Sequence, residues 1–209
     1  MALVLIACEC SGGVREAIAA RGHDVWSCDL KPTEIPGQHL QGDLRDHIYA
    51  QHWDFIGFHT DCTFMCNSGV WCLKRDPKRH EQLKEACELF NLCLRHPAPG
   101  YLENPIPHKY AVEQLDRSYD QLIQPYHFGH PESKATCLWL KGVPKLLPTN
   151  KLQKPACGYW DNQTPSGQNK LGPSKSRAAD RARTYSGIAS AIAEQWFLDQ
   201  SEFSIMGSE

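Results

Sequence analysis

Short apolar runs that alternate with helical patterns constrain the fold of this chain more than any other feature. Leu3–Cys8 is apolar throughout, as expected for a central strand of a parallel sheet, and a turn then leads into a helical pattern over Val14–Arg21. Pro77–Leu94 is the clearest helix, with apolar residues at helical spacing. Further strands are predicted at Val25–Cys28, His39–Gln41, Phe55–Phe58 and Cys137–Leu140, and a last helix at Ile188–Phe197. This alternation predicts a doubly wound α/β sheet.

The size and charge of the chain favour one domain over residues 1–209. The chain has 209 residues, of which 41% are hydrophobic, and its formal net charge is -2. The whole molecule therefore lacks the positive excess that is typical of nucleic-acid-binding proteins. Residues 144–183 nevertheless carry eight basic and two acidic side chains, and they are rich in Pro, Gly, Ser and Lys. We expect a loop-rich segment there, which is either a solvated loop or a phosphate-binding strip.

The ten cysteines are expected to be mostly free thiols in a reducing cytosol. The chain has no Cys-x-x-Cys pair, and Cys8-Glu9-Cys10 is too tight for the usual zinc knuckle. Four cysteines fall within apolar stretches, namely Cys28, Cys87, Cys93 and Cys137. A second group has no spacing typical of a metal site: His59, Cys62, Cys66, Cys72 and His80. We therefore expect no metal.

The apolar N-terminus admits two interpretations. Met1–Cys8 resembles a lipoprotein signal that ends in a cysteine, but it has no basic leader and its apolar run is short, which favours a buried strand. No apolar run approaches the roughly 20 residues that a membrane span needs. We expect no membrane partner and a cytoplasmic location.

Polar residues gather where the predicted strands end, and ligands of doubly wound sheets bind beyond these carboxyl ends. After the first strand comes a turn that contains Glu9, Ser11, Gly12 and Gly13, where glycine lets a ligand approach the backbone and the helix N-terminus favours polar groups. Asp29, about twenty residues on, has the position of a carboxylate that holds ribose hydroxyls. Asp43 either adds to this site or caps the helix that follows. Together these residues predict a cofactor that contains a nucleoside.

Two further strand ends carry a thiol and a carboxylate. Cys62 follows the strand Phe55–Phe58, and Glu103 follows the apolar pair Tyr101-Leu102. A thiolate adds to a carbon of a planar ring while a carboxyl group handles the balancing proton. The neighbouring carboxylate of Asp61 disfavours the thiolate, so Lys134, His59 or a substrate phosphate would have to offset it. For Asn104 the alternative role is a helix cap.

At these residues the chain resembles the cytosine-C5 methyltransferase family, most closely its short phage-type members. The resemblance runs from about Leu3 to Trp196. Its motifs, in order, are the turn Glu9–Gly13, the acid Asp29, the pair Gly42-Asp43, the nucleophile Cys62, the pair Glu103-Asn104, the segment Gly129–Thr136, the strand Cys137–Leu140 and the helix motif Tyr185–Ala193.

This resemblance implies a Rossmann-like class I methyltransferase fold, a mostly parallel sheet flanked by helices, with S-adenosylmethionine as the cofactor. It implies that Cys62 adds to C6 of cytosine and that Glu103 acts at N3, with Lys134 as a third catalytic residue. Cofactor-binding residues are then Glu9, Ser11, Gly12, Gly13, Asp29 and Asp43. Substrate-binding residues are His59, Asp61, Asn104, Thr136, Arg181 and Arg183. The implied partner is a cytosine nucleotide or DNA, in the cytoplasm of a bacterial host if the protein is phage-encoded.

The chain departs from the family pattern at three places. Thr60-Asp61 replaces a Pro-Pro pair before the nucleophile, and Lys134 and Thr136 replace two arginines. Only about forty residues, Gly142–Arg183, fill the space of a large target-recognition domain, too few to read a duplex major groove. A free nucleotide, single-stranded DNA or duplex DNA with little sequence preference is therefore favoured. The alternatives are a non-catalytic cofactor- or nucleic-acid-binding protein and a different pyrimidine-modifying enzyme that uses the same Cys62–Glu103 pair.

Overall fold

A seven-stranded sheet forms the centre of the molecule, in the strand order β3-β2-β1-β4-β5-β7-β6. The computed structural model describes residues 1–172 and 181–198. The strands are β1 (Leu3–Ala7), β2 (Asp24–Asp29), β3 (His39–Gln41), β4 (Phe55–Phe58), β5 (Gly100–Pro105), β6 (Gln121–Ile123) and β7 (Thr136–Lys141). Neighbours from β3 to β5 pair in parallel, whereas β7 runs antiparallel to both β5 and β6.

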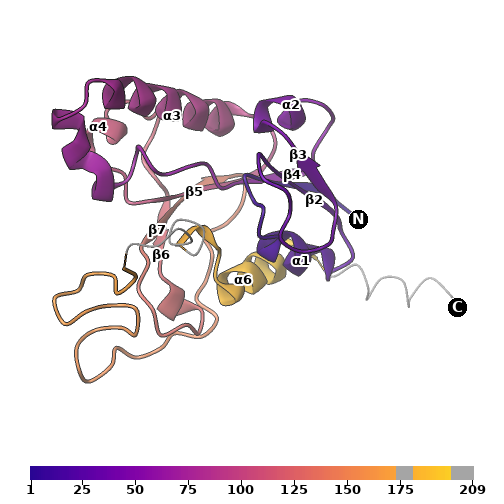
Figure 1. Ribbon diagram of the computed structural model, residues 1–209. Coiled ribbons are helices and arrows are strands. Elements are labelled where there is room, and N and C mark those ends of the chain that lie inside the picture. Colours follow the sequence, from indigo (N-terminus) through magenta and orange to yellow (C-terminus); the bar gives the residue numbers. More distant parts are fainter. Residues whose placement is uncertain (173–180, 199–209) are drawn as a thin grey trace, which may run out of the picture.

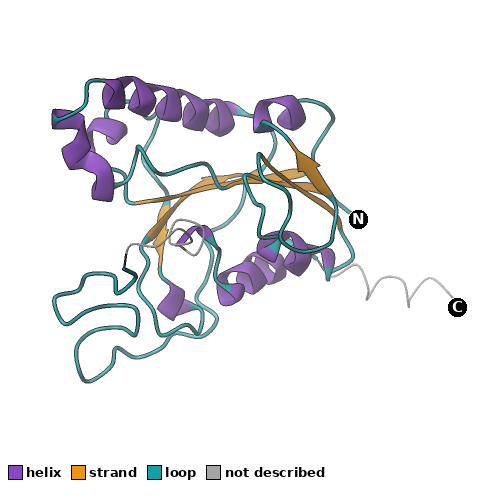
Figure 2. Cartoon of the chain, viewed as in Figure 1, coloured by secondary structure: helices purple, strands orange, loops and turns teal. Residues whose placement is uncertain are grey.

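Helices cover both faces of the sheet (Figures 1 and 2). One face carries α1 (Gly13–Ala19) and α6 (Ser186–Trp196), and the other carries α2 (Leu44–Ile48) and α3 (Lys78–Arg95). The short elements η1 (Asn67–Lys74) and α4 (Lys109–Val112) lie beside one end of α3, and η2 (Pro125–His127) precedes β7. The result is a three-layer α/β arrangement.

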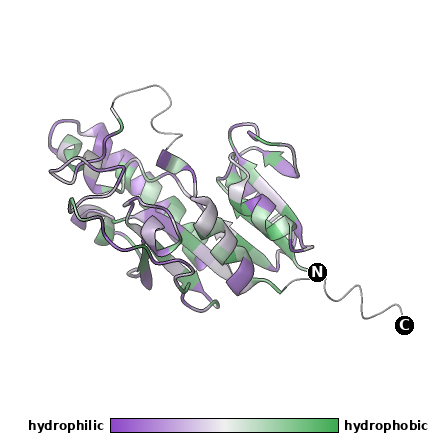
Figure 3. Cartoon of the chain, turned by 90° about the horizontal axis from the view of Figure 1, so that it is seen from below, coloured by the Kyte–Doolittle hydropathy of each residue, from purple (hydrophilic) through white to green (hydrophobic). Residues whose placement is uncertain are grey.

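The alternation of side chains along the strands divides the core in two. Leu5 and Ala7 of β1 belong to the cluster on the α2 and α3 side, whereas Val4 and Ile6 belong to the cluster on the α1 and α6 side. Figure 3, seen from the α1 and α6 side, shows hydrophobic and hydrophilic residues on the same helices, as expected for helices buried along one stripe.

A close backbone approach fixes how β5 lies beside β4. Gly100, at the start of β5, has φ 146°, and a Cβ there would lie 1.9 Å from the carbonyl oxygen of Ile56. Only glycine fits at this position, because any side chain would push the two strands apart. The pairing brings the carboxyl ends of β4 and β5, and so the segments that carry Cys62 and Glu103, to the same edge of the sheet.

This strand order, with only β7 reversed, defines a Rossmann-like class I methyltransferase fold and confirms the predicted fold class. The sequence did not predict β6, η1 or α4. Residues 142–172 contain no helix or strand, as expected for the basic segment.

Several general features of the described residues bear on function. All ten cysteines lie within these residues, and none of them forms a disulfide. Over residues 1–172 and 181–198, no group of three or more His, Cys, Asp or Glu side chains has a metal-binding arrangement. In the same ranges, no helix is both long enough and apolar enough to cross a bilayer.

Candidate functional site

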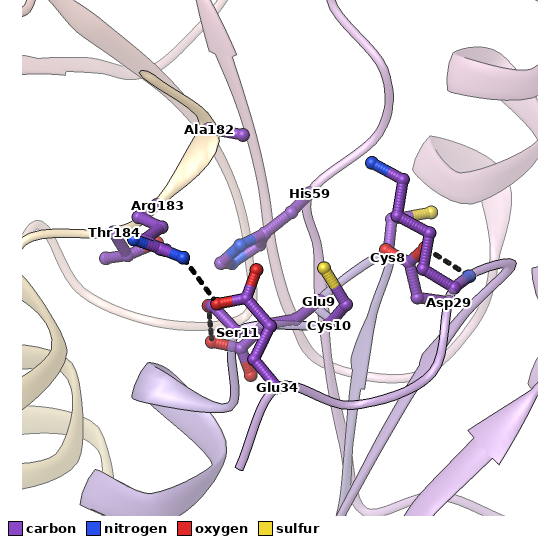
Figure 4. A pocket seen from close by; sticks show the side chains of 11 residues that line it. Cys8, Glu9, Cys10, Ser11, Asp29, Glu34, His59, Ala182, Arg183 and Thr184 are labelled. Atoms are coloured by element: carbon purple, nitrogen blue, oxygen red, sulfur yellow. Dashed lines mark hydrogen bonds and ion pairs between the residues drawn. The ribbon is translucent and has the colours of Figure 1, made fainter. Parts of the chain in front are cut away.

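A pocket of about 100 Å³ opens at the carboxyl ends of β1 and β2 (Figure 4). Three segments and one histidine line it: the turn Cys8–Ser11, the residues Asp29, Lys31 and Glu34 after β2, His59 after β4, and residues 182–184 before α6. Three of these side chains are carboxylates. The pocket therefore lies where ligands of doubly wound sheets bind, and it is rich in hydrogen-bond acceptors.

Glu9 both lines this pocket and caps α1. Its carboxylate is buried and accepts the backbone N–H groups of Val14 at 2.7 Å and Arg15 at 3.2 Å. Gly12 precedes the helix with φ 73°, and a Cβ there would meet Ile35 at 2.7 Å. Glu9 therefore already occupies the amides of the helix N-terminus, so a ligand in this pocket meets a carboxylate instead of free N–H groups. Gly12 and Gly13 shape the turn, and Ser11 lines the pocket directly.

The two predicted aspartates have different surroundings. Asp29 lines the pocket, and one of its oxygens accepts the N–H of Lys31 at 2.9 Å. Asp43 is the N-cap of α2, where it accepts the N–H of Arg45 at 2.9 Å and forms an ion pair with the same residue at 3.2 Å. Asp43 is not among the residues that line the pocket. The structure thus brings Asp29, but not Asp43, to the pocket.

An ion pair crosses the pocket from one wall to the other. The guanidinium of Arg183 lies 2.7 Å from the carboxylate of Glu34, as the dashed line in Figure 4 shows. This contact joins the loop after β2 to the segment before α6, which are 149 residues apart in sequence. Arg183, which was predicted to bind the substrate, therefore lines the same pocket as Glu9, Ser11 and Asp29, which were predicted to bind the cofactor.

A histidine links Glu103 to a buried tyrosine on the α1 and α6 side of the sheet. His59 Nε2 lies 2.6 Å from the hydroxyl of Tyr101, and its Nδ1 lies 3.8 Å from Glu103 Oε1. Burial, followed by the charges of Glu103 and Glu9, holds the pKa of Tyr101 well above its usual value. The phenol therefore keeps its proton and shares a hydrogen bond with Nε2, which holds the ring of His59 beside Glu103.

The thiol of Cys62 lies at the start of a tight turn. The N–H groups of Met65 and Cys66 both donate to the carbonyl oxygen of Cys62, at 3.1 and 3.0 Å. The pKa of the Cys62 thiol is raised far above its usual value, first by a hydrogen bond with the side chain of Cys66 and then by burial. Asp61 adds a smaller increase, and Lys134 lowers the pKa. As expected, Asp61 raises the pKa of Cys62 and Lys134 lowers it, but Cys66 changes this pKa more than either of them does.

Asp61 itself is occupied locally. Its carboxylate accepts the N–H of Thr63 at 2.9 Å and the hydroxyl of Thr63 at 2.6 Å, so it stabilises the turn that follows Cys62. It remains exposed to solvent. The carboxylate therefore has a structural role in the turn and retains an open side.

Three of the remaining predicted residues, Asn104, Lys134 and Thr136, lie in β5, at the start of β7 or just before it. Lys134 donates to the carbonyl oxygen of Arg183 at 3.3 Å, and Thr136 pairs with Pro105 across the sheet. Asn104 lies inside β5 and donates to the carbonyl oxygen of Pro105, so it is not a helix cap; its buried Oδ1 has no partner among the described residues. Arg181 is exposed.

The structure thus forms two groups at one edge of the sheet. Cys62 is grouped with Cys66, Asp61 and Lys134, and Glu103 is grouped with His59 and Tyr101. Within the described part of the chain, no hydrogen bond or ion pair joins Cys62 to Glu103 directly. The sequence analysis did not single out Tyr101 or Glu34, and it considered Cys66 only as a metal ligand. The position of Cys66 one helical turn after Cys62 was the one available indication of its role.

No protein-family model matches this chain, and no curated protein matches it in sequence. Among solved structures, it is similar to a crystal structure described as a candidate DNA modification methyltransferase encoded within an E. coli prophage. The two chains share 15% sequence identity with a TM-score of 0.45, over 73% of this chain and 52% of the other. The chain thus spans about half the length of that protein.

Proposed function

We propose that this protein transfers a methyl group, or a related one-carbon group, from S-adenosylmethionine to C5 of cytosine in a nucleotide or in DNA with little sequence specificity. One observation carries the proposal. In a methyltransferase-type sheet, a thiol and a carboxylate lie at the carboxyl ends of two adjacent parallel strands, one strand away from an acid-lined pocket.

The lining of the pocket fits the proposed cofactor. S-adenosylmethionine has a positively charged sulfonium, an ammonium and two ribose hydroxyls, all of which are complementary to carboxylates. Glu9, Asp29 and Glu34 supply three carboxylates around the pocket. In the proposal Asp29 holds the ribose hydroxyls. When bound, the cofactor supplies the methyl group.

The residues of the chain provide the remaining chemistry. The Cys62 thiolate forms a bond to C6 of the ring, and Glu103 shares a proton with N3, so that the electron pair moves to C5 and makes it nucleophilic. After C5 has gained the new carbon, loss of the C5 proton and cleavage of the sulfur–C6 bond restore the aromatic ring and the free thiol. Lys134 favours the thiolate by its positive charge.

The polar contacts of Glu103 support this assignment. The carboxylate of Glu103 is partly buried, and its Oε1 lies 3.8 Å from Nδ1 of His59, so a polar ring stands beside the group that would act at N3. Tyr101 fixes the ring of His59 from the other side. In this scheme His59 acts through Glu103 and is a positioning residue.

A fluorinated substrate tests the proposal. Fluorine at C5 cannot leave as a proton does, so a short single strand with one 5-fluorocytosine is expected to remain bonded to Cys62. Intact mass spectrometry should show the mass of protein plus strand plus the transferred group, only when S-adenosylmethionine is present. Cys62→Ser should give no adduct, whereas Cys157→Ser, at an exposed thiol outside the site, should behave as the wild type. An adduct with Cys62→Ser, or none with the wild type, would contradict the proposal.

The second candidate function is non-catalytic binding, and the high pKa of Cys62 favours it. The same experiment separates the two functions. A protein that only binds would retain S-adenosylmethionine in calorimetry but would form no covalent adduct.

A further inference from the structure

An exposed tryptophan with an arginine over its ring lies a short distance along the chain from Cys62. Trp71 belongs to η1, is 55% exposed, and has the guanidinium of Arg75 4.9 Å from its ring centre. Several other large apolar side chains are as exposed as Trp71, so its exposure alone indicates nothing; the guanidinium beside the indole is what distinguishes it. Indole and guanidinium are both flat groups on which nucleic-acid bases stack.

The surroundings of Trp71 carry a local excess of positive charge. Lys74, Arg75 and Lys78 are exposed, and in the described part of the chain none of them has a carboxylate partner within 4.0 Å. Asp76 lies among them, and its carboxylate accepts the N–H of Lys78. By contrast, Arg95 and Arg117 are neutralised by aspartates at 2.6 Å. Within the described residues, Lys74, Arg75 and Lys78 thus keep positive charges that no carboxylate neutralises, unlike the charges of Arg95 and Arg117.

This region is joined directly to the turn that carries Cys62. Arg79, in the first turn of α3, donates to the carbonyl oxygen of Thr63 at 3.2 Å, and its guanidinium lies 4.4 Å from the ring centre of Phe64. Thr63 and Phe64 follow Cys62 immediately. In Figure 1, η1 lies beside the start of α3 and is joined to it by a short loop. Phe64, Trp71, Lys74, Arg75, Lys78 and Arg79 are hereafter called the Trp71 surface.

We propose that the Trp71 surface binds a single-stranded polynucleotide and leads it to Cys62. An unpaired base stacks on Trp71, and phosphates lie against Lys74, Arg75 and Lys78. Stacking on an exposed ring requires a base that is free of its partner, and therefore a single strand rather than a duplex. The presentation of cytosine to Cys62 rests on the proposed function, whereas the binding of the strand does not.

The binding test uses the full chain without cofactor and a labelled oligodeoxycytidine of about 12 nucleotides, a length that suits one binding surface. Fluorescence anisotropy is measured at about 50 and 200 mM salt. Trp71→Ala should weaken binding by about tenfold or more, and Trp71→Phe should retain most of it because the ring persists. Trp71 is exposed, so these variants should keep the fold; circular dichroism checks this.

The charge test compares two matched pairs of lysines. Lys74→Ala with Lys78→Ala should reduce the slope of log affinity against log salt by about 0.7 for each lost phosphate contact. Lys151→Ala with Lys154→Ala removes the same charge from the exposed basic segment and should change the slope less. Affinity that is insensitive to Trp71→Ala, a larger effect of the Lys151 and Lys154 pair, or tighter binding of a duplex would each overturn the proposal.

The same variants separate this proposal from the methyl-transfer chemistry. If the wild type binds the strand through Trp71 but forms no adduct with 5-fluorocytosine, the surface stands and the proposed reaction fails. If an adduct forms equally well with Trp71→Ala at low strand concentration, the reaction stands and the surface is wrong.

Discussion

The protonation state of Cys62 depends on a neighbour, Cys66. The hydrogen bond between the two side chains is the largest cause of the raised pKa, ahead of burial and of the charge of Asp61. A protein that uses the Cys62 thiolate therefore has to change this contact when the substrate binds. Insertion of a pyrimidine ring beside the thiol would do so by displacing the Cys66 side chain.

Removal of Cys66 tests this order of causes. Cys66→Ala should lower the pKa of Cys62, because its thiol no longer has the partner that disfavours the thiolate. Asp61→Asn should lower it by a smaller amount. The measurement is the rate of iodoacetamide alkylation at Cys62 as a function of pH, read by peptide mass spectrometry. A larger downward shift in Asp61→Asn would show that charge, and not the thiol contact, controls Cys62.

The two aspartates offer a matched comparison for the cofactor site. Asp29→Ala should weaken S-adenosylmethionine binding by about 10- to 100-fold, because hydrogen bonds to a charged group are lost. Asp43→Ala should leave that affinity nearly unchanged and should instead cost about 1 kcal/mol of stability, because Asp43 caps α2. Calorimetry and urea unfolding measure the two effects. Unchanged affinity in Asp29→Ala would place the cofactor elsewhere.

At the scale of secondary-structure elements, a half-buried lysine joins β7 to the end of α3. Lys141 Nζ donates to the carbonyl oxygens of Cys93 and His96, at 3.2 and 2.5 Å, at the C-terminal end of α3. Burial lowers the pKa of Lys141 from 10.5 to about 8. The helix and the antiparallel edge of the sheet are thus joined by a group that titrates in the alkaline range.

This lysine should make stability depend on pH in a defined direction. Between pH 8 and 10.5 the unfolded chain keeps the proton that folded Lys141 has released, so its contribution to stability rises with pH and falls away as pH drops to 8. In Lys141→Met the side chain does not titrate, so this pH dependence of the stability is absent. Urea unfolding of both proteins at pH values near 8 and 10 should show a wild type that gains stability relative to the variant. A constant difference would indicate an unshifted lysine.

The central elements of the fold could be predicted from the sequence because their residue patterns indicate which side chains are buried. β1 and β4 consist of apolar runs, and α3 repeats apolar residues at helical spacing. β6 was missed because its three residues contain one buried side chain, Ile123, and no periodicity. β6 exists because β7 offers it a partner, which is a tertiary effect.

The candidate site was predictable only where chain order dictates it. Parallel strands bring the segment after β4 and the carboxyl-terminal half of β5 to one edge of the sheet, so the placement of Cys62 and Glu103 at that edge followed from the strand pattern. The Tyr101–His59 contact and the Glu34–Arg183 ion pair depend on side-chain directions and on residues far apart in sequence. The alternative role of Asn104 as a helix cap is wrong because β5 continues through Pro105.

At the scale of the whole molecule, the small segment between β7 and α6 limits the choice of substrate. Residues 142–172 pack against the segment before β7: the ring of Trp160 stacks on Tyr126 at 4.5 Å, and Asn162 donates to the carbonyl oxygen of Ser133. Residues 142–172 form no helix or strand that would enter a major groove. In a duplex the target base would also have to be flipped out of the helix, at a cost of a few kcal/mol.

Single-stranded DNA should therefore be modified at least as fast as duplex DNA. A mononucleotide should react with a shallower salt dependence than a strand, because it releases fewer counterions. Initial rates on deoxycytidine monophosphate, on a single strand and on its duplex, each at two salt concentrations, decide the order. A strong preference for one duplex sequence would refute this expectation.

The packing of α1 against α6 has a consequence for biosynthesis. Val14 and Ile18 of α1 share a hydrophobic cluster with Ile188 and Ile192 of α6, although about 170 residues separate them in sequence. During translation the ribosome completes all seven strands before it makes α6. The part of that sheet face which α6 covers, and the side of α1 that packs on α6, therefore remain open to water and to other nascent chains until residues 186–196 emerge. Chains interrupted before that point should be caught by chaperones or should aggregate, even though every strand is already present.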